Sequence, residues 1–115
     1  MKFPHCRKLL LAATAVAALV STPTFGFDEE AARALAKKND CFKCHAVDKT
    51  KKGPSYKKIA AKYRGKEAEG EQKMLKNITT GPKVKLEDGS EEDHKIIDSK
   101  DQGELKNLIQ WILSL

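Results

Sequence analysis

The sequence predicts an all-α domain of about four helices. Three observations favour this class. Apolar residues recur at helical spacing in segments that we place at residues 28–38, 55–64, 67–80 and 101–113. Gly-Pro pairs at 53–54 and 81–82 mark turns between helices. No segment sustains the strict alternation of a strand, so we expect no sheet.

The first 26 residues have the composition of a secretory signal peptide. Basic residues open the chain, an apolar run follows from Leu9 to Val20, and small residues lead to Gly26. An apolar run of this length is too short to span a bilayer and fits the central region of a signal peptide. We therefore expect a signal peptide over residues 1–26, a mature domain over residues 27–115 without a membrane span, and a periplasmic location. The alternative is an uncleaved anchor.

The predicted mature domain is mildly basic. The chain carries 22 Lys and Arg against 16 Asp and Glu. Loss of Lys2, Arg7 and Lys8 takes the basic count from 22 to 19 and leaves a net charge of +3. A net charge this small is weak for nucleic-acid binding, and we expect none. A domain of this size has a modest core, so a bound apolar group would add stability.

The first helix is predicted over residues 28–38. Acidic side chains crowd its start, and Lys37 and Lys38 end it, which matches the helix dipole. Its expected buried side carries small residues that allow another helix to approach closely, namely Ala32, Leu35 and Ala36.

Directly after this helix comes a C-x-x-C-H run, from Cys41 to His45. Its two thiols are close enough in sequence to add to the two vinyl groups of one haem, and the next imidazole then lies under the iron. This spacing is the attachment signature of c-type haem. A zinc site of Cys41, Cys44, His45 and His94 has the right ligand count, but adjacent Cys44 and His45 seldom reach one tetrahedral ion together. We therefore expect one covalent haem c.

Three more helices follow the motif. Ser55 can cap the second helix, and Gly81 with Pro82 ends the third. The last helix has a clear amphipathic stripe formed by Leu105, Leu108, Ile109, Ile112 and Leu113. Residues 83–100 are polar and without a sustained period, so we expect a long loop there, with at most a short strand near Val84. A long loop inside a small domain usually has a function.

In this order and spacing, the elements resemble a small bacterial class I c-type cytochrome over the whole mature chain. The resemblance implies four helices around one covalent haem, with Cys41 and Cys44 in thioether links and His45 as the proximal iron ligand. It also implies that the carbonyl of Pro54 accepts the other ring N–H of His45.

The second iron ligand departs from the family pattern. The family places a Met in the loop before the last helix, and this loop has none. Met74 lies in line with the apolar side of its helix, which favours core packing. His94 lies in the loop near the place of the missing Met, and imidazole is a normal haem ligand. We therefore expect His94 to bind the iron.

These residues predict a one-electron carrier with bis-histidine haem, and not an enzyme. The alternative is a haem-based gas sensor or small haem enzyme with an open or displaceable sixth site. Lysines around the motif predict redox partner proteins with an acidic docking face. These lysines are Lys43, Lys49, Lys51, Lys52, Lys57 and Lys58.

Overall fold

The computed structural model describes residues 12–19 and 26–115. Most of the predicted signal peptide, including its basic start, lies outside the described residues. The part that is described, residues 12–19, contains neither helix nor strand. The cleavage site after Gly26 therefore stays a prediction.

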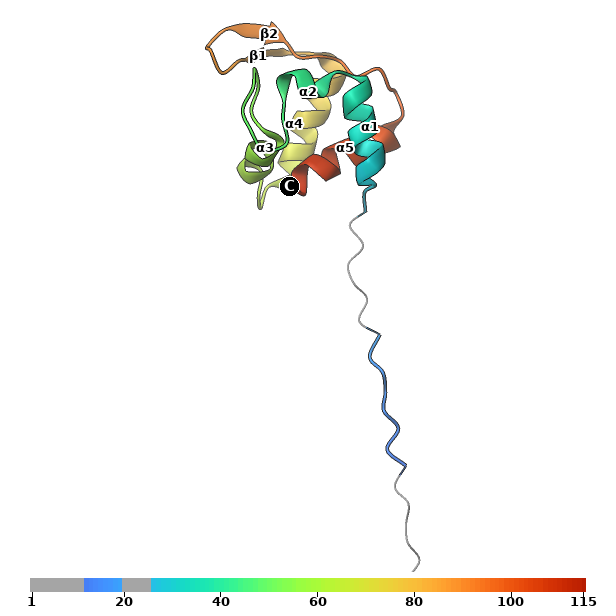
Figure 1. Cartoon of the computed structure of the whole chain (residues 1–115). Helices are drawn as coiled ribbons and strands as arrows, with labels where there is room; N and C mark the ends of the chain where they lie inside the picture. Colours follow the sequence, from blue (N-terminus) through green and yellow to red (C-terminus); the bar gives the residue numbers. More distant parts are fainter. Residues whose placement is uncertain (1–11, 20–25) are drawn as a thin grey trace, which may run out of the picture.

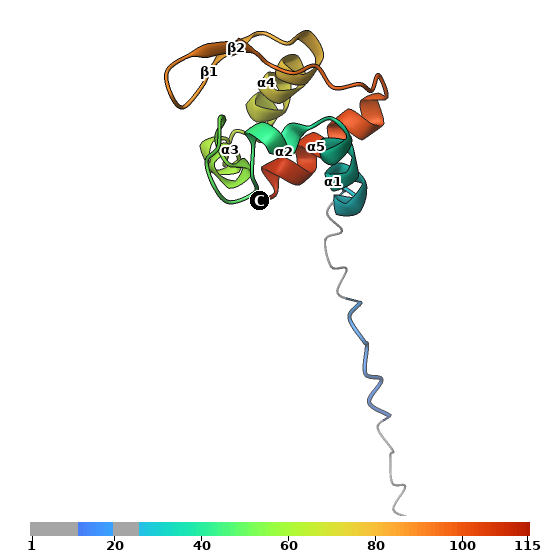
Figure 2. The same cartoon turned by 45° about the horizontal axis from the view of Figure 1, so that its top comes forward.

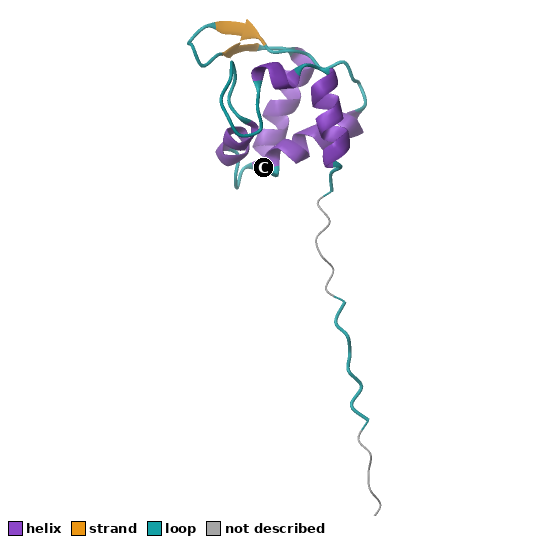
Figure 3. Cartoon of the chain, viewed as in Figure 1, coloured by secondary structure: helices purple, strands orange, loops and turns teal. Residues whose placement is uncertain are grey.

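The domain is helical, with one small hairpin (Figures 1 and 3). The described residues form five helices and two strands in the following order: α1 Glu29–Lys38, α2 Cys41–Cys44, α3 Tyr56–Lys62, α4 Glu67–Thr80, β1 Lys83–Lys85, β2 Glu91–Asp93 and α5 Gln102–Leu113. All four predicted helices are present, and α4 has the predicted bounds. The all-α class is confirmed, with a short sheet in addition.

Side chains cap three of these helices as the local sequence requires. Asp28 accepts a hydrogen bond from the backbone N–H of Ala31 at the start of α1. The Ser55 hydroxyl accepts from Lys58 N at the start of α3. Asp101 accepts from the first free N–H groups of α5. Each cap satisfies a donor that the helix leaves unpaired, and a cap of this kind stabilises by roughly 1 kcal/mol.

The core forms where α5 crosses the other helices. Helix α5 packs against α1, α3 and α4, and Figure 2 shows it running past α1 toward α3. Ala32 and Ala36 are fully buried on α1, so the small residues predicted there do allow close approach. The largest buried side chains come from α5 and include Trp111, Leu105, Leu108 and Ile109. Burial of each such side chain contributes about 1.5–3 kcal/mol.

The first and last helices of the domain are tied by reciprocal hydrogen bonds. The backbone N–H of Asp28 donates to Asn107 Oδ1 at 2.6 Å. The Asn107 amide in turn donates to the Asp28 carbonyl at 2.8 Å. This clasp joins the start of α1 to the middle of α5.

The expectation of no sheet was wrong. Strands β1 and β2 pair antiparallel, with Val84 opposite Glu92. Gly89 turns the hairpin at a φ of +86°, which a glycine adopts without strain. The hairpin residues are exposed or half-buried on both faces. Strand β1 lies where a short strand near Val84 was allowed, but β2 was not expected, because a strand with no buried face leaves no apolar alternation in the sequence. The one-turn helix α2 is also additional, since four residues are too few to show a helical period.

No helix within the described ranges combines the length and the apolar character needed to cross a bilayer.

Candidate functional site

The C-x-x-C-H run folds as a single helical turn that begins after Asp40. Asp40 has a φ of +58°, a left-handed conformation that Asp tolerates better than most residues. Cys41 and Cys44 are three residues apart on this turn, which places them on one side of it. Both are free thiols and half-buried. Burial raises the pKa of the Cys41 thiol above its usual value, while the Tyr56 hydroxyl acts in the opposite direction.

His45 lies directly after this turn and is held through one ring nitrogen. Its Nδ1 is 2.7 Å from the carbonyl oxygen of Pro54. A carbonyl only accepts, so Nδ1 carries the proton and Nε2 keeps its lone pair. Burial lowers the pKa of His45, and the hydrogen bond to Pro54 opposes that effect. The side chain is therefore a neutral imidazole with one nitrogen free to bind a metal.

Two neighbours fix the plane of the His45 ring. Gly53 leaves no room for a side chain, because a Cβ there would lie 2.8 Å from His45 Cε1. Tyr56 stacks on the ring, with centroids 5.3 Å apart and planes inclined by 20°. Tyr56 in turn meets the edge of Trp111 at 5.6 Å. Burial raises the pKa of Tyr56 far above its usual value, so the phenol stays protonated.

His94 comes from the segment that follows β2 and lies close to His45. The two ring centroids are 6.2 Å apart, and the planes are inclined by 35°. His94 Nδ1 is 2.9 Å from the carbonyl oxygen of Lys95, which again leaves Nε2 free. The backbone N–H of His94 donates to Pro82 O at 2.9 Å. Two imidazoles 49 positions apart in sequence therefore lie close together, each with its Nδ1 hydrogen-bonded to a carbonyl.

Met74 does not share this gap with the two histidines. It is buried in the hydrophobic core together with Ile78, Trp111 and the residues of α5. This agrees with its predicted packing role.

Asn39 is a residue that sequence reasoning missed. It is 2% exposed, and its amide donates to Leu35 O on α1. Its Oδ1 accepts from the backbone N–H of Asp98 at 2.8 Å. The loop that carries His94 is thereby attached to the first helix. A single polar residue after a helix gave no signal of this role, because its partner lies 59 residues away.

A helical domain with this Cys, Cys and His set defines a small c-type haem protein. Residues 29–115 match the family described as Cytochrome c. The chain therefore belongs to the cytochrome c family, and its cofactor is covalently bound haem c.

Known relatives agree with this assignment. The class 1 cytochrome MtoD of Sideroxydans lithotrophicus ES-1 is 54% identical, with a TM-score of 0.72 over 77% of this chain and 97% of that one. The N64Del mutant of cytochrome c552 of Nitrosomonas europaea is 32% identical, with a TM-score of 0.57 over 71% of this chain and 96% of that one. Cytochrome c-551 of Allochromatium vinosum is 40% identical over 47 residues, or 41% of this chain. This chain spans about half the length of that curated relative, 49%.

The described residues fit the cofactor chemically. Free thiols lie beside a neutral imidazole. Two buried polar atoms, Trp111 Nε1 and Asn77 Oδ1, have no hydrogen-bond partner among the described residues, so polar groups remain for a further ligand. As in its family, the protein is a haem c electron carrier of the class I type, and such small cytochromes are typically periplasmic or exported.

Proposed function

We propose that this chain is a periplasmic one-electron carrier whose single haem c is bound by two histidines. In this proposal Cys41 and Cys44 form the thioether links, and His45 and His94 bind the iron from opposite sides. The residues 1–26 act as the signal peptide that directs export. Bound haem supplies a reversible one-electron couple, and the chain supplies its ligands and surroundings.

The observation that carries the proposal is the distance between the two rings. A metal–imidazole bond is about 2.0–2.1 Å long. Two such bonds, plus the distance from each bound nitrogen to the centroid of its own ring, add up to about the 6.2 Å between the centroids of His45 and His94. Each Nδ1 is hydrogen-bonded to a carbonyl, which leaves both Nε2 atoms for the iron. Ligands are commonly oriented by such second hydrogen bonds.

Two imidazole ligands have a consequence for the potential. Imidazole is a stronger donor than a thioether and stabilises ferric iron more. A bis-histidine haem therefore has a lower potential than a His/Met haem in similar surroundings, within the range of about 0.8 V that axial ligands span. An iron closed on both sides has no site for a substrate, which favours a carrier over an enzyme or gas sensor.

Partners of the carrier are proposed to be redox proteins with an acidic docking face. The support is the excess of exposed lysine on a domain of net positive charge. Opposite charge on two surfaces raises the rate of encounter more than the final affinity.

A spectroscopic experiment tests the axial ligands. Near-infrared magnetic circular dichroism of the oxidised holoprotein distinguishes two nitrogen ligands from one nitrogen and one sulfur. We expect the bis-nitrogen signature in low-spin iron. A sulfur signature that disappears in Met74→Leu would contradict the proposal. Rapid carbon monoxide binding by the reduced wild type would favour the gas sensor or haem enzyme.

A further inference from the structure

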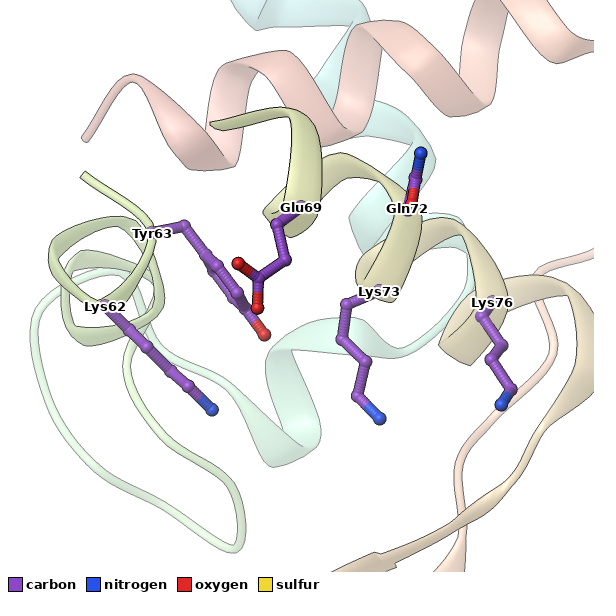
Figure 4. Close-up of a pocket in the computed structure, with 6 residues that line it drawn as sticks. All are labelled: Lys62, Tyr63, Glu69, Gln72, Lys73 and Lys76. Carbon is purple, nitrogen blue, oxygen red and sulfur yellow. The ribbon is translucent and has the colours of Figure 1, made fainter. Parts of the chain in front are cut away.

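A lysine-lined groove runs between α3 and α4. Its volume is about 480 Å³, and it is lined by Lys62, Tyr63, Glu69, Gln72, Lys73 and Lys76. Figure 4 shows the side chains of Lys62, Lys73 and Lys76 extending on the same side of the two helices. We call these six residues the α3–α4 groove.

The spacing of the α4 residues explains why they line one groove. Positions 69, 72, 73 and 76 follow the helical pattern i, i+3, i+4 and i+7, so they share one side of α4. The buried residues Gly70, Met74 and Ile78 lie on another side, against the core. The lysines are therefore directed away from the core by the helix itself.

The α3–α4 groove keeps a net positive charge among the described residues. Three lysines and one glutamate give the lining a net charge of +2. Within the described part of the chain, Lys62, Lys73 and Lys76 form no ion pair with a carboxylate. Lys62 Nζ lies 5.4 Å from the centroid of the Tyr63 ring, a cation–π contact that leaves its charge in place.

The lysines near the haem motif differ in this respect. Three of the six are paired with acidic residues of the same chain: Lys43 with Asp40, Lys52 with Glu92 and Lys58 with Glu87. The last two acids come from the hairpin, Glu92 from β2 and Glu87 from the turn between the strands. An acidic partner that docks here must displace or repel carboxylates already in place.

The two helices that line the α3–α4 groove also support the site, each at its other end. Helix α3 begins at Tyr56, which stacks on His45. Helix α4 ends two residues before Pro82, whose carbonyl accepts from the backbone N–H of His94. The groove residues lie further along both helices, outside the site itself.

We infer that the α3–α4 groove is a docking surface for acidic side chains of a redox partner protein. This inference rests on the proposed carrier function and locates its contact surface on Lys62, Lys73 and Lys76. It differs from the sequence-based expectation, which placed docking on the lysines around the motif.

The test uses the ferric, isotope-labelled holoprotein and a hexaglutamate peptide at low ionic strength, with hexaglutamine as the uncharged control peptide. Backbone amide shifts are followed by NMR. We expect hexaglutamate to shift amides of α3 and α4 around residues 62–76 and hexaglutamine to shift none. The Lys62→Gln, Lys73→Gln, Lys76→Gln triple variant should bind about tenfold more weakly, since each exposed ion pair contributes a few-fold.

A matched variant removes the same number of charges elsewhere. Lys49→Gln, Lys51→Gln, Lys57→Gln changes lysines around the motif that have no carboxylate partner in the described chain. It should retain most of the affinity. If this variant loses binding and the groove variant keeps it, the motif lysines are the docking surface and the inference is wrong. The inference also fails if no amide near the α3–α4 groove shifts.

Failure here is separable from failure of the carrier proposal. The axial ligands are reported by the absorption and magnetic circular dichroism spectra, which neither lysine triple should change. If the ligand assignment is wrong, those spectra show it, whether or not the peptide binds at the α3–α4 groove.

Discussion

The two histidines of the site are held in opposite ways. His45 lies between a carbonyl, a glycine and a stacked tyrosine, all within eleven residues of it in sequence. His94 lies on an exposed segment after a hairpin, and its support comes from distant residues. Its backbone binds Pro82, and Lys95 beside it pairs with Asp40 at 3.6 Å. The proximal side is fixed by local packing, whereas the distal side depends on contacts that close over the site.

This difference indicates how substitutions near His45 and substitutions near His94 should differ in their effects. Local packing has a low entropic cost, because few residues need to be ordered to form it. The hairpin before His94 is joined to Lys52 and to helix α3 by the Lys52–Glu92 and Lys58–Glu87 pairs, at 3.6 and 4.0 Å. Such exposed pairs contribute little each, about 0–1 kcal/mol. We expect variants on the proximal side to affect holoprotein formation and variants on the distal side to affect ligation of the iron.

The largest effect is expected at the attachment cysteines. Cys41→Ser should remove one thioether link and leave little stable holoprotein, because a bound apolar group would add stability to the modest core of a domain this small. Mass spectrometry and acid-acetone extraction of purified protein measure this. Haem that stays with the wild-type chain, together with a much lower yield of haem-bearing variant, would agree with the prediction. Extraction of haem from the wild type would contradict the c-type assignment.

The next effect is expected at the distal ligand. His94→Ala should open the iron, with high-spin character in the oxidised spectrum and new carbon monoxide binding after reduction. His94→Met should raise the potential by part of the range of about 0.8 V that axial ligands span. Met74→Leu serves as the control and should leave the spectrum unchanged, since Met74 packs in the core. An unchanged His94→Ala spectrum would exclude His94 as a ligand.

Two glycines allow the two sides to be compared directly. In Gly53→Ala the new Cβ would lie 2.8 Å from His45 Cε1, and overpacking of this kind costs about 1–3 kcal/mol. In Gly81→Ala the new Cβ would lie 2.8 Å from the His94 carbonyl oxygen. The backbone φ there is +60°, a left-handed conformation that costs a residue other than glycine about 1–2 kcal/mol. Gly53→Ala should lower the yield of holoprotein. Gly81→Ala should mainly speed carbon monoxide binding, measured by stopped flow. The reverse pattern would contradict the comparison.

The smallest effect is expected at Asp40, a surface carboxylate that pairs with Lys43 in the attachment turn and with Lys95 beside His94. Hydrogen bonding to Lys43 lowers the pKa of Asp40, with a smaller contribution from Lys95. A lowered folded-state pKa stabilises the fold above the unfolded value of about 3.9, and this stability is lost as the pH falls through the folded-state value. Asp40→Asn should remove that part of the acid dependence. Asn also tolerates the left-handed backbone, so the change isolates the charge. Urea titrations at pH 3 and pH 7 measure it; equal losses at both pH values would contradict it.

Local signals in the sequence predicted most of the fold. Helical period and capping residues placed α1, α3, α4 and α5, because those signals are contained in short windows. The hairpin was missed because neither of its faces is buried. The attachment motif predicted Cys41, Cys44 and His45 as a group, and the structure places His45 beside Pro54 as expected.

Tertiary placement could not be predicted in the same way. The 6.2 Å between His45 and His94 depends on where a long polar segment returns, and no periodicity encodes that. The role of Asn39 and the unneutralised charge on α4 also depend on which acids lie nearby in space. Lysines close in sequence to the motif were expected to dock a partner, but the hairpin brings Glu87 and Glu92 to two of them.

The clasp between Asp28 and Asn107 has a consequence for the order of assembly. It joins residues 79 positions apart, so it cannot form until nearly the whole chain is available. Closing a long segment costs entropy that later contacts must offset, which delays such contacts in folding. During that delay α5 has not yet packed against α1, the helix that contacts the C-x-x-C-H turn. We therefore expect the turn to be most accessible to haem before α1 and α5 are joined.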